Sequence, residues 1–139
     1  EEMLDALRNA AKRGVDVRLV LPGIPDKKLV FRLSRSYYLP LLQAGGRIYE
    51  YTPGFLHAKC WVSDDRAAVV GSINMDYRSL FLTFENAVYL CRHPAVGTVR
   101  ADFEETFGLC RPITEATYKS YGVFKRIAGR IMRLFAPLV

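Results

Sequence analysis

Apolar residues recur at helical and strand spacings through the first half of the chain, and these spacings predict alternating helices and strands. Residues 2–13 repeat apolar positions three and four apart, which predicts a helix ending near Gly14. The runs VDVRLVLPG and RIYEY predict short strands. Between them, residues 29–44 follow a helical pattern in which Pro40 marks a kink or the first turn of a second helix. This alternation favours an α/β fold with a mixed, mostly parallel sheet flanked by helices.

The second half of the chain predicts a hairpin, a third strand and a closing helix. A polar turn at residues 63–66 is followed by AAVVGSIN, which predicts a returning strand, and TFENAVYLC is a third strand-like run. Residues 94–109 carry a helical apolar stripe. Residues two apart on a strand share a face, so His57 and Lys59 form one pair and Ser72 and Asn74 another. The hairpin is therefore expected to bring four polar side chains together.

The last residues of the chain predict a basic amphipathic helix. Apolar residues recur at three and four from residue 120 to 138, with Lys125, Arg126, Arg130 and Arg133 on the other side. Such a helix is typical of a segment lying on an anionic membrane surface. The alternative is a terminal helix packed on the domain, and the two are compatible if one apolar edge packs.

Charge is concentrated in the same region, which narrows the possible partners. Residues 111–139 hold six of the 20 basic residues but only one of the 14 acidic ones, so the preceding chain is close to neutral. An enzyme acting on nucleic acid is expected to spread positive charge around its site, so we expect no nucleic-acid partner.

Length and composition indicate one globular domain. The chain has 139 residues, half of them hydrophobic, which is enough for a core. Its three cysteines are widely spaced, which favours a reducing compartment over a disulfide framework. No apolar run reaches the roughly 18 residues of a membrane span. Because the chain begins within a helical pattern and without Met, we interpret it as a fragment of a longer protein.

The polar groups of the hairpin suit attack on a phosphodiester. A neutral imidazole, with an unperturbed pKa of about 6.5, makes His57 a nucleophile near neutral pH. Lys59 is a point charge for phosphate oxygens, and Ser72 and Asn74 can donate hydrogen bonds to them. Glu85 can accept an imidazole proton and fix its tautomer. These donors make a metal ion unnecessary, and the sequence indicates neither a metal site nor a cofactor.

At these residues the chain resembles the phospholipase D superfamily. The signature His-x-Lys-x4-Asp-x6-Gly-Ser-x-Asn is satisfied at every position, by His57, Lys59, Asp64, Gly71, Ser72 and Asn74. The resemblance implies a phospholipase D-like fold and a covalent phosphohistidine-type intermediate on His57. It also places Lys59, Asp64 and Glu85 in the catalytic machinery, with Asp64 more structural than catalytic. Residues 1–110 would form the catalytic half-domain, and residues 111–139 the basic amphipathic segment.

Within the superfamily, most of the chain resembles the C-terminal half of bacterial cardiolipin synthases. The likeness rests on AAKRGVDVRLVLPGIPD, SRSYYLPLLQAGGRIYEYTPGFLHAK and GSINMDYRSLFLTFENAVY, with LTFE standing where LNFE is expected. It implies joining of two phosphatidylglycerols to cardiolipin with release of glycerol, at the bacterial cytoplasmic membrane. Only one motif is present, so the second would come from an N-terminal half or from a second copy of the chain.

Two other classes of function stay open at this point. A phospholipase D-type or nuclease-type phosphodiesterase would use the same motif chemistry. A non-catalytic lipid-binding module would use only the amphipathic segment.

The motif assigns no role to three further residues. Asp76 and Arg78 could bridge each other or contact substrate, and His93 is interpreted as a surface or capping histidine.

Overall fold

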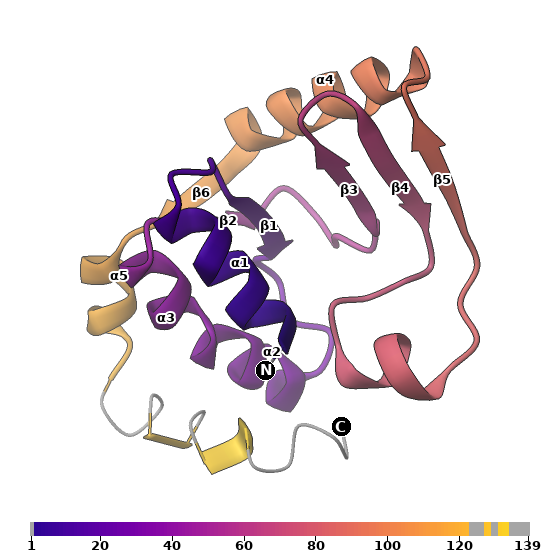
Figure 1. The fold of residues 1–139 in the computed structure, drawn as a ribbon. Helices are drawn as coiled ribbons and strands as arrows, with labels where there is room; N and C mark the ends of the chain where they lie inside the picture. Colours follow the sequence, from indigo (N-terminus) through magenta and orange to yellow (C-terminus); the bar gives the residue numbers. More distant parts are fainter. Residues whose placement is uncertain (1, 123–126, 129–130, 134–139) are drawn as a thin grey trace. The chain divides into compact units, whose positions relative to one another are not determined.

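The chain folds into two compact units, described here from a computed structural model that covers residues 2–122, 127–128 and 131–133 (Figure 1). Unit 1 comprises Glu1–Phe55 and Cys110–Val139, and unit 2 comprises Leu56–Leu109. The predicted catalytic half-domain, residues 1–110, spans parts of both units and stays a prediction. The residues directly after 110 form a strand that returns to the sheet of unit 1.

Unit 1 is a small sheet covered by helices. Strand β1 pairs with β2 in parallel, and β6 pairs with β2 antiparallel. The parallel pair is made possible by the crossover through two helices that joins β1 to β2. In chain order the elements of unit 1 are α1 (Glu2–Lys12), β1 (Arg18–Pro22), α2 (Lys28–Ser36), α3 (Tyr38–Gln43), β2 (Arg47–Tyr51), β6 (Cys110–Ile113) and α5 (Glu115–Ser120).

The core of unit 1 follows the predicted apolar stripes. Leu4, Leu7 and Ala10 of α1 pack against a buried cluster that α3, β2, β6 and α5 complete. Pro40 lies in the first turn of α3, where its missing N–H breaks no helical hydrogen bond. The second-helix interpretation of residues 29–44 is thereby confirmed. The buried cluster consists of Ala11, Val17, Tyr38, Leu41, Ala44, Ile48, Ile113 and Tyr118.

A buried carboxylate ties three elements of unit 1 together. Glu50 of β2 is 0% exposed, and Arg35 of α2 donates to both of its oxygens at 2.8 and 2.9 Å. Arg111 of β6 donates to it at 2.5 Å and the Tyr38 hydroxyl at 3.2 Å. Burial, and then the charge of Glu50, raises the pKa of the Tyr38 hydroxyl. Since the carboxylate is paired and hydrogen-bonded on all sides, its burial is tolerated.

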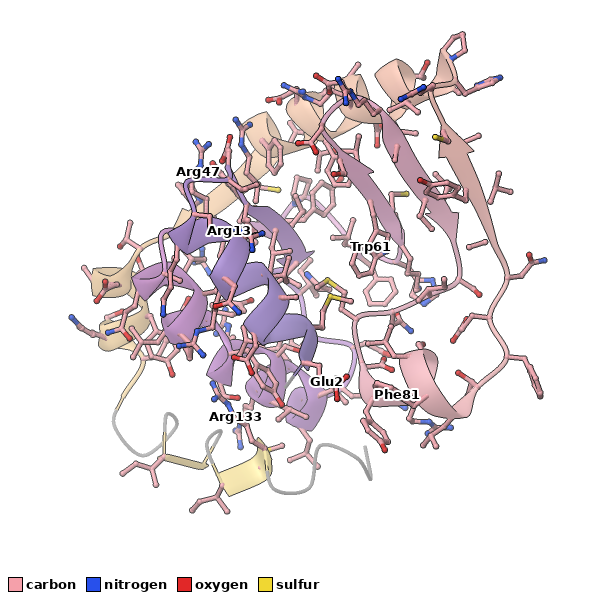
Figure 2. All side chains as sticks on the ribbon, in the orientation of Figure 1. Glu2, Arg13, Arg47, Trp61, Phe81 and Arg133 are labelled. Carbon is pink, nitrogen blue, oxygen red and sulfur yellow. The ribbon has the colours of Figure 1, made fainter. Side chains whose placement is uncertain are left out.

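The predicted amphipathic helix at residues 120–138 lies mostly outside the described residues. Among the described ones, Ile127 and Ile131 are exposed. Arg133, predicted on the basic face, instead donates to the side chain and carbonyl of Ser36 and stacks on the Tyr37 ring at 4.4 Å. Figure 2 shows Arg133 beside α2. No helix in the described part of the chain combines the length and apolar character that a membrane span requires.

Unit 2 is an antiparallel sheet with one long helix. β3 (Cys60–Ser63), β4 (Ala67–Gly71) and β5 (Ala87–Cys91) pair in that order. The π-helical turn η1 (Arg78–Leu82) lies between β4 and β5, and α4 (Ala95–Leu109) packs on all three strands. The most deeply buried apolar residues of unit 2 are Val96 of α4 and Ala68 of β4.

The mixed α/β fold class is confirmed, but the expectation of a mostly parallel sheet is wrong. Among the described strands, only β1 and β2 pair in parallel, and the other three pairings are antiparallel. The physical reason lies in the connections. A hairpin and the turn through η1 reverse the chain between successive strands of unit 2, whereas only the α2–α3 crossover restores its direction.

The buried cluster predicts a large effect of one substitution in unit 1. Glu50→Gln leaves the partly buried Arg35 guanidinium without its counter-charge, and we expect it to lower the free energy of unfolding by about 3 kcal/mol. Urea denaturation at pH 7 measures the loss.

Asp16→Asn is the matched control, because Asp16 also pairs with two arginines, Arg18 and Arg47, but its side chain is 47% exposed. We expect it to cost less than about 1 kcal/mol. These arginines lower the pKa of Asp16 to about 2, so its contribution is complete above the ordinary value of 3.8 and disappears as the pH falls through 2. Equal losses for the two variants at pH 7 would contradict the role given to burial.

Candidate active site

A tight turn closes the hairpin that holds the motif. Asp64 and Asp65 have φ angles of 51° and 54°, and the Arg66 N–H donates to the Ser63 carbonyl at 3.0 Å. Two successive positive φ values define a type I′ turn, which Asp tolerates better than most residues. Asp65 is anchored to α4 by Arg100 at 2.6 Å. The structure thus places motif residue Asp64 in the turn that sets the hairpin register.

At the other end of the hairpin, the predicted polar side chains line one open pocket. Its volume is roughly 360 Å³. His57 and Lys59 precede β3, whereas Ser72 and Asn74 follow β4. The expected convergence is therefore confirmed, although His57 and Lys59 lie just outside the strand on which they were predicted. The pocket is lined by His57, Lys59, Gly71, Ser72, Asn74 and Glu85.

Glycine is required at position 71 because two strands approach closely there. A Cβ atom on Gly71 would lie 2.3 Å from the Asn86 carbonyl oxygen and 2.6 Å from the Cα of Ala87. The Gly71 N–H also donates to the Lys59 carbonyl at 3.1 Å. The motif glycine thus allows the end of β4, the start of β5 and the segment before β3 to meet at the pocket.

Glu85 reaches the pocket from the segment before β5 and is held by hydroxyl groups. Ser72 Oγ donates to Glu85 Oε2 in a short hydrogen bond, and Thr83 Oγ1 donates to Oε1 at 3.0 Å. The Asn86 N–H donates to Ser72 Oγ at 3.0 Å. This hydrogen bond holds the Ser72 hydroxyl in the position from which it donates to Glu85. Thr83 stands where the expected pattern LNFE has asparagine, and its hydroxyl still supplies a hydrogen-bond donor to Glu85.

The hydroxyl donors keep Glu85 ionised. Hydrogen bonds from Ser72, then from Ser79 and Thr83, hold the pKa of Glu85 below its ordinary value, and the charge of Lys59 lowers it further. Donors to the charged form of a carboxyl group stabilise that form. The pocket therefore combines an anionic acceptor with the cationic Lys59 at neutral pH.

The remaining motif side chains have distinct environments. His57 is exposed, and its backbone carbonyl accepts from Lys59 Nζ at 2.7 Å, which folds the lysine back over the segment. The Asn74 amide Nδ2 donates to Ser79 Oγ at 3.3 Å. Both His57 and Glu85 line the pocket, and the orientation of the imidazole by Glu85 stays a prediction.

Two residues outside the motif, His93 and Asp76, make local structural contacts. His93 Nδ1 accepts from the Ala95 N–H at 3.2 Å at the start of α4, as expected for a capping histidine. Asp76 accepts the Ser79 N–H at 2.8 Å and so holds the first turn of η1. Sequence reasoning missed Thr83 as a partner of Glu85 and Ser79 as a partner of Asn74. The signal available for Ser79 was a hydroxyl residue directly before three apolar ones, Leu80, Phe81 and Leu82.

The arrangement is suited to phosphoryl chemistry. An imidazole, an ammonium, a hydroxyl and an amide surround one open space, so a nucleophile faces donors for the phosphate oxygens. Among the described residues, no group of three or more His, Cys, Asp or Glu side chains is placed to hold a metal ion.

Comparison with solved structures defines the class of fold. The crystal structure of a phospholipase D family member, Nuc from Salmonella typhimurium, superimposes with a TM-score of 0.69 over 81% of this chain and 73% of that chain. The two sequences are 21% identical, so the likeness concerns the fold. The phospholipase D-like fold expected from the motif is confirmed.

Comparison of sequences then identifies the family. The family described as "Cardiolipin synthase, PLD-like domain" matches residues 1–107, and the chain belongs to it. Cardiolipin synthases of Geobacillus sp. and Halalkalibacterium halodurans are 42% and 40% identical over the whole chain. An uncharacterized protein of Streptococcus mutans is 47% identical over 99% of it. The chain spans only 28–30% of the length of these relatives.

The hydroxyl network predicts the titration of Glu85. We expect its carboxyl midpoint, followed by carbon-detected NMR, to lie below the ordinary value of 4.5. Ser72→Ala removes the strongest donor and should raise the midpoint toward that value. Ser120→Ala, whose hydroxyl donates within α5, should leave it unchanged. A wild-type midpoint at or above 4.5 would contradict the network.

Proposed function

We propose that this chain supplies one half of the active site of a cardiolipin synthase-type phosphatidyltransferase that joins two phosphatidylglycerols and releases glycerol. The observation that carries the proposal is the pocket in which His57, Lys59, Ser72, Asn74 and Glu85 meet. Family membership and the relatives named cardiolipin synthase support the choice of substrate.

The reaction proceeds in two displacements. A histidine nitrogen attacks the phosphorus of the first phosphatidylglycerol, and the phosphorus–oxygen bond to the glycerol headgroup breaks. The departing glycerol takes a proton from the second histidine of the site. That histidine then accepts the proton of a headgroup hydroxyl on the second phosphatidylglycerol, whose oxygen attacks the phosphohistidine, forms cardiolipin and frees the first histidine. His57 takes one of these roles and its counterpart takes the other.

The neighbouring side chains stabilise the charge that builds up on the phosphate. Lys59 supplies a full positive charge, and the Asn74 amide supplies a neutral hydrogen bond to an equatorial oxygen. Ser72, predicted to do the same, donates its single proton to Glu85 and so holds that carboxylate at the pocket. Glu85 orients the imidazole of His57 and stabilises it when it is positively charged. Asp64 contributes by setting the turn of the hairpin. Because protein donors neutralise the phosphate, the reaction needs no metal ion.

The second histidine must come from outside this pocket. The chain has two histidines, and His93 caps α4 instead of lining the pocket with His57. The N-terminal part of a longer protein, carrying a second motif, is the favoured source, because the relatives are more than three times as long as this chain. A second copy of the chain is the alternative. Exposed apolar side chains of unit 2, among them Phe84, Val88 and Tyr89, fit such a covering partner.

The substrate is a lipid, so the protein works at a membrane surface. The basic segment at residues 120–138 is proposed to hold the enzyme on anionic lipid of the bacterial cytoplasmic membrane. Arg133, which is engaged by Ser36 and Tyr37, would link this segment to the end of α2.

The proposal predicts the products of the full-length parent protein with phosphatidylglycerol vesicles and a chelator. Mass spectrometry should find cardiolipin and free glycerol in equal amounts. His57→Ala should lower the rate by at least about 100-fold, because it removes a nucleophile or proton-transfer group. His93→Ala is the matched control and should retain the wild-type rate.

Each other outcome identifies a different function. Phosphatidic acid would indicate that water is the acceptor, and therefore a phospholipase. Cleavage of DNA without lipid products would indicate a nuclease. Vesicle binding without any product, unchanged in His57→Ala, would indicate a lipid-binding module. Each of these results would overturn the transferase assignment.

A further inference from the structure

The π-helical turn η1 carries a cluster of exposed apolar side chains on unit 2. Tyr77, directly before the turn, is 43% exposed, and Phe81 and Leu82 within it are 60% and 62% exposed (Figure 2). The ring centroids of Tyr77 and Phe81 lie 4.9 Å apart, so the two rings pack on each other. We call these three residues the η1 apolar surface. Exposed apolar side chains that cluster in this way are typical of a contact surface.

Hydrogen bonds hold the turn that carries this surface. The Ser79 N–H donates to the Asp76 carboxylate at 2.8 Å, and the Leu80 N–H donates to the Asp76 carbonyl at 3.1 Å. Farther along, the N–H and the hydroxyl of Thr83 both donate to the Arg78 carbonyl, at 2.9 and 3.0 Å. These backbone groups are therefore paired within the protein. Such pairing allows a segment to enter an apolar environment without leaving the paired groups unsatisfied.

The same turn is joined to the candidate active site. Asn74 precedes the turn and Glu85 follows it, and both residues line the pocket. Asn74 Nδ2 lies 3.3 Å from Ser79 Oγ, and Thr83 Oγ1 donates to Glu85 Oε1 at 3.0 Å. The η1 apolar surface is therefore carried by the segment that connects two pocket-lining residues and is hydrogen-bonded to both of them.

The proposed substrate determines what this surface meets. The phosphate of phosphatidylglycerol lies in the headgroup layer of a membrane, and its acyl chains lie in the bilayer beneath. A protein that takes this phosphate into an open pocket must bring the pocket to the headgroup layer, and the segment hydrogen-bonded to the pocket then reaches the same layer. Apolar side chains at a membrane surface enter the boundary between headgroups and acyl chains to a depth of about 5–10 Å. Tyrosine is enriched at this boundary.

The charges beside the η1 apolar surface fit an anionic lipid layer. Arg78 is exposed, and within the described ranges its side chain forms no ion pair. The neighbouring carboxylate of Asp76 is engaged by the Ser79 N–H. A free cation next to apolar side chains is attracted to anionic headgroups while its neighbours enter the lipid.

We propose that the η1 apolar surface inserts into the lipid layer beside the active site and holds the pocket at the depth of the lipid phosphate. It is a membrane contact separate from the basic segment at residues 120–138. The proposal rests on the proposed function, because the lipid substrate is the reason that the pocket must lie at a membrane.

Kinetics of the full-length parent protein test the insertion with two forms of phosphatidylglycerol: long-chain lipid in vesicles, and short-chain lipid kept as monomers in solution. The double variant Phe81→Ser, Leu82→Ser should lower kcat/KM on vesicles about tenfold or more, because it removes apolar area that is buried in lipid. On the short-chain lipid it should keep the wild-type value, since no lipid layer has to be entered. The matched control is Val15→Ser with Leu109→Ser, which removes two exposed apolar side chains elsewhere and should keep both values.

Fluorescence detects the insertion without relying on turnover. Phe81→Trp keeps an aromatic ring, and lipids brominated in their acyl chains quench tryptophan on contact. Compared with wild type, Phe81→Trp should add emission that brominated lipid quenches. Tyr89→Trp is the control, because Tyr89 is similarly exposed, at 66%, but belongs to the apolar side chains assigned to the covering partner. Its added emission should be unaffected by brominated lipid.

The kinetic outcomes bear on the insertion alone if wild type turns over phosphatidylglycerol. An unchanged rate of the double variant on vesicles would then overturn the insertion. So would an equal loss on both forms of the lipid by a variant that circular dichroism shows to be folded.

Quenching decides the insertion by itself if the double variant does not fold, or if wild type makes no lipid product and the transferase assignment fails. Quenching by brominated lipid in Phe81→Trp and not in Tyr89→Trp would support the insertion. Absence of quenching in Phe81→Trp, or equal quenching in Tyr89→Trp, would overturn it. Protection of the Phe81→Trp emission from both brominated lipid and aqueous acrylamide would identify a protein partner as the occupant instead.

Discussion

The hydrogen bond between Ser72 and Glu85 is the contact on which the candidate site depends. It joins the end of β4 to the segment that enters β5, at the point where Gly71 lets the two backbones approach. Without this hydrogen bond, the Glu85 carboxylate would lose its strongest hydrogen-bond donor and would not be held in the lining of the pocket. The motif residues from His57 to Asn74 therefore have two functions. They supply the reactive groups, and they shape the strand ends that face each other across the pocket.

Two carboxylates show how the chain separates stability from chemistry. Glu50 is fully buried between Arg35 and Arg111, so its charge is neutralised and it serves the packing of unit 1. Glu85 borders an open pocket and is held by neutral hydroxyl groups. Neutral donors keep a carboxylate ionised without cancelling its charge. Such a group can still interact with an imidazolium, which a carboxylate clamped by two arginines could do far less well.

Local sequence patterns predicted most of the elements and the convergence of the motif residues. Both depend on spacing within a hairpin, which the chain specifies locally. The pairing of β6 with β2 was not predictable in this way, because it joins residues about sixty positions apart. The roles of Ser79 and Thr83 were missed because they depend on a π-helical turn that has no simple periodic signature. The contact of Arg133 with Ser36 is likewise nonlocal.

The central claim is that phosphatidyl transfer passes through a covalent intermediate in which His57 takes part. Exchange of glycerol tests it most directly: the full-length parent protein is given phosphatidylglycerol and isotopically labelled glycerol, with a chelator present. A phosphohistidine intermediate predicts that labelled glycerol enters phosphatidylglycerol, and that His57→Ala abolishes the exchange while His93→Ala does not. Formation of cardiolipin with no label in phosphatidylglycerol, or exchange that survives His57→Ala, would contradict the account.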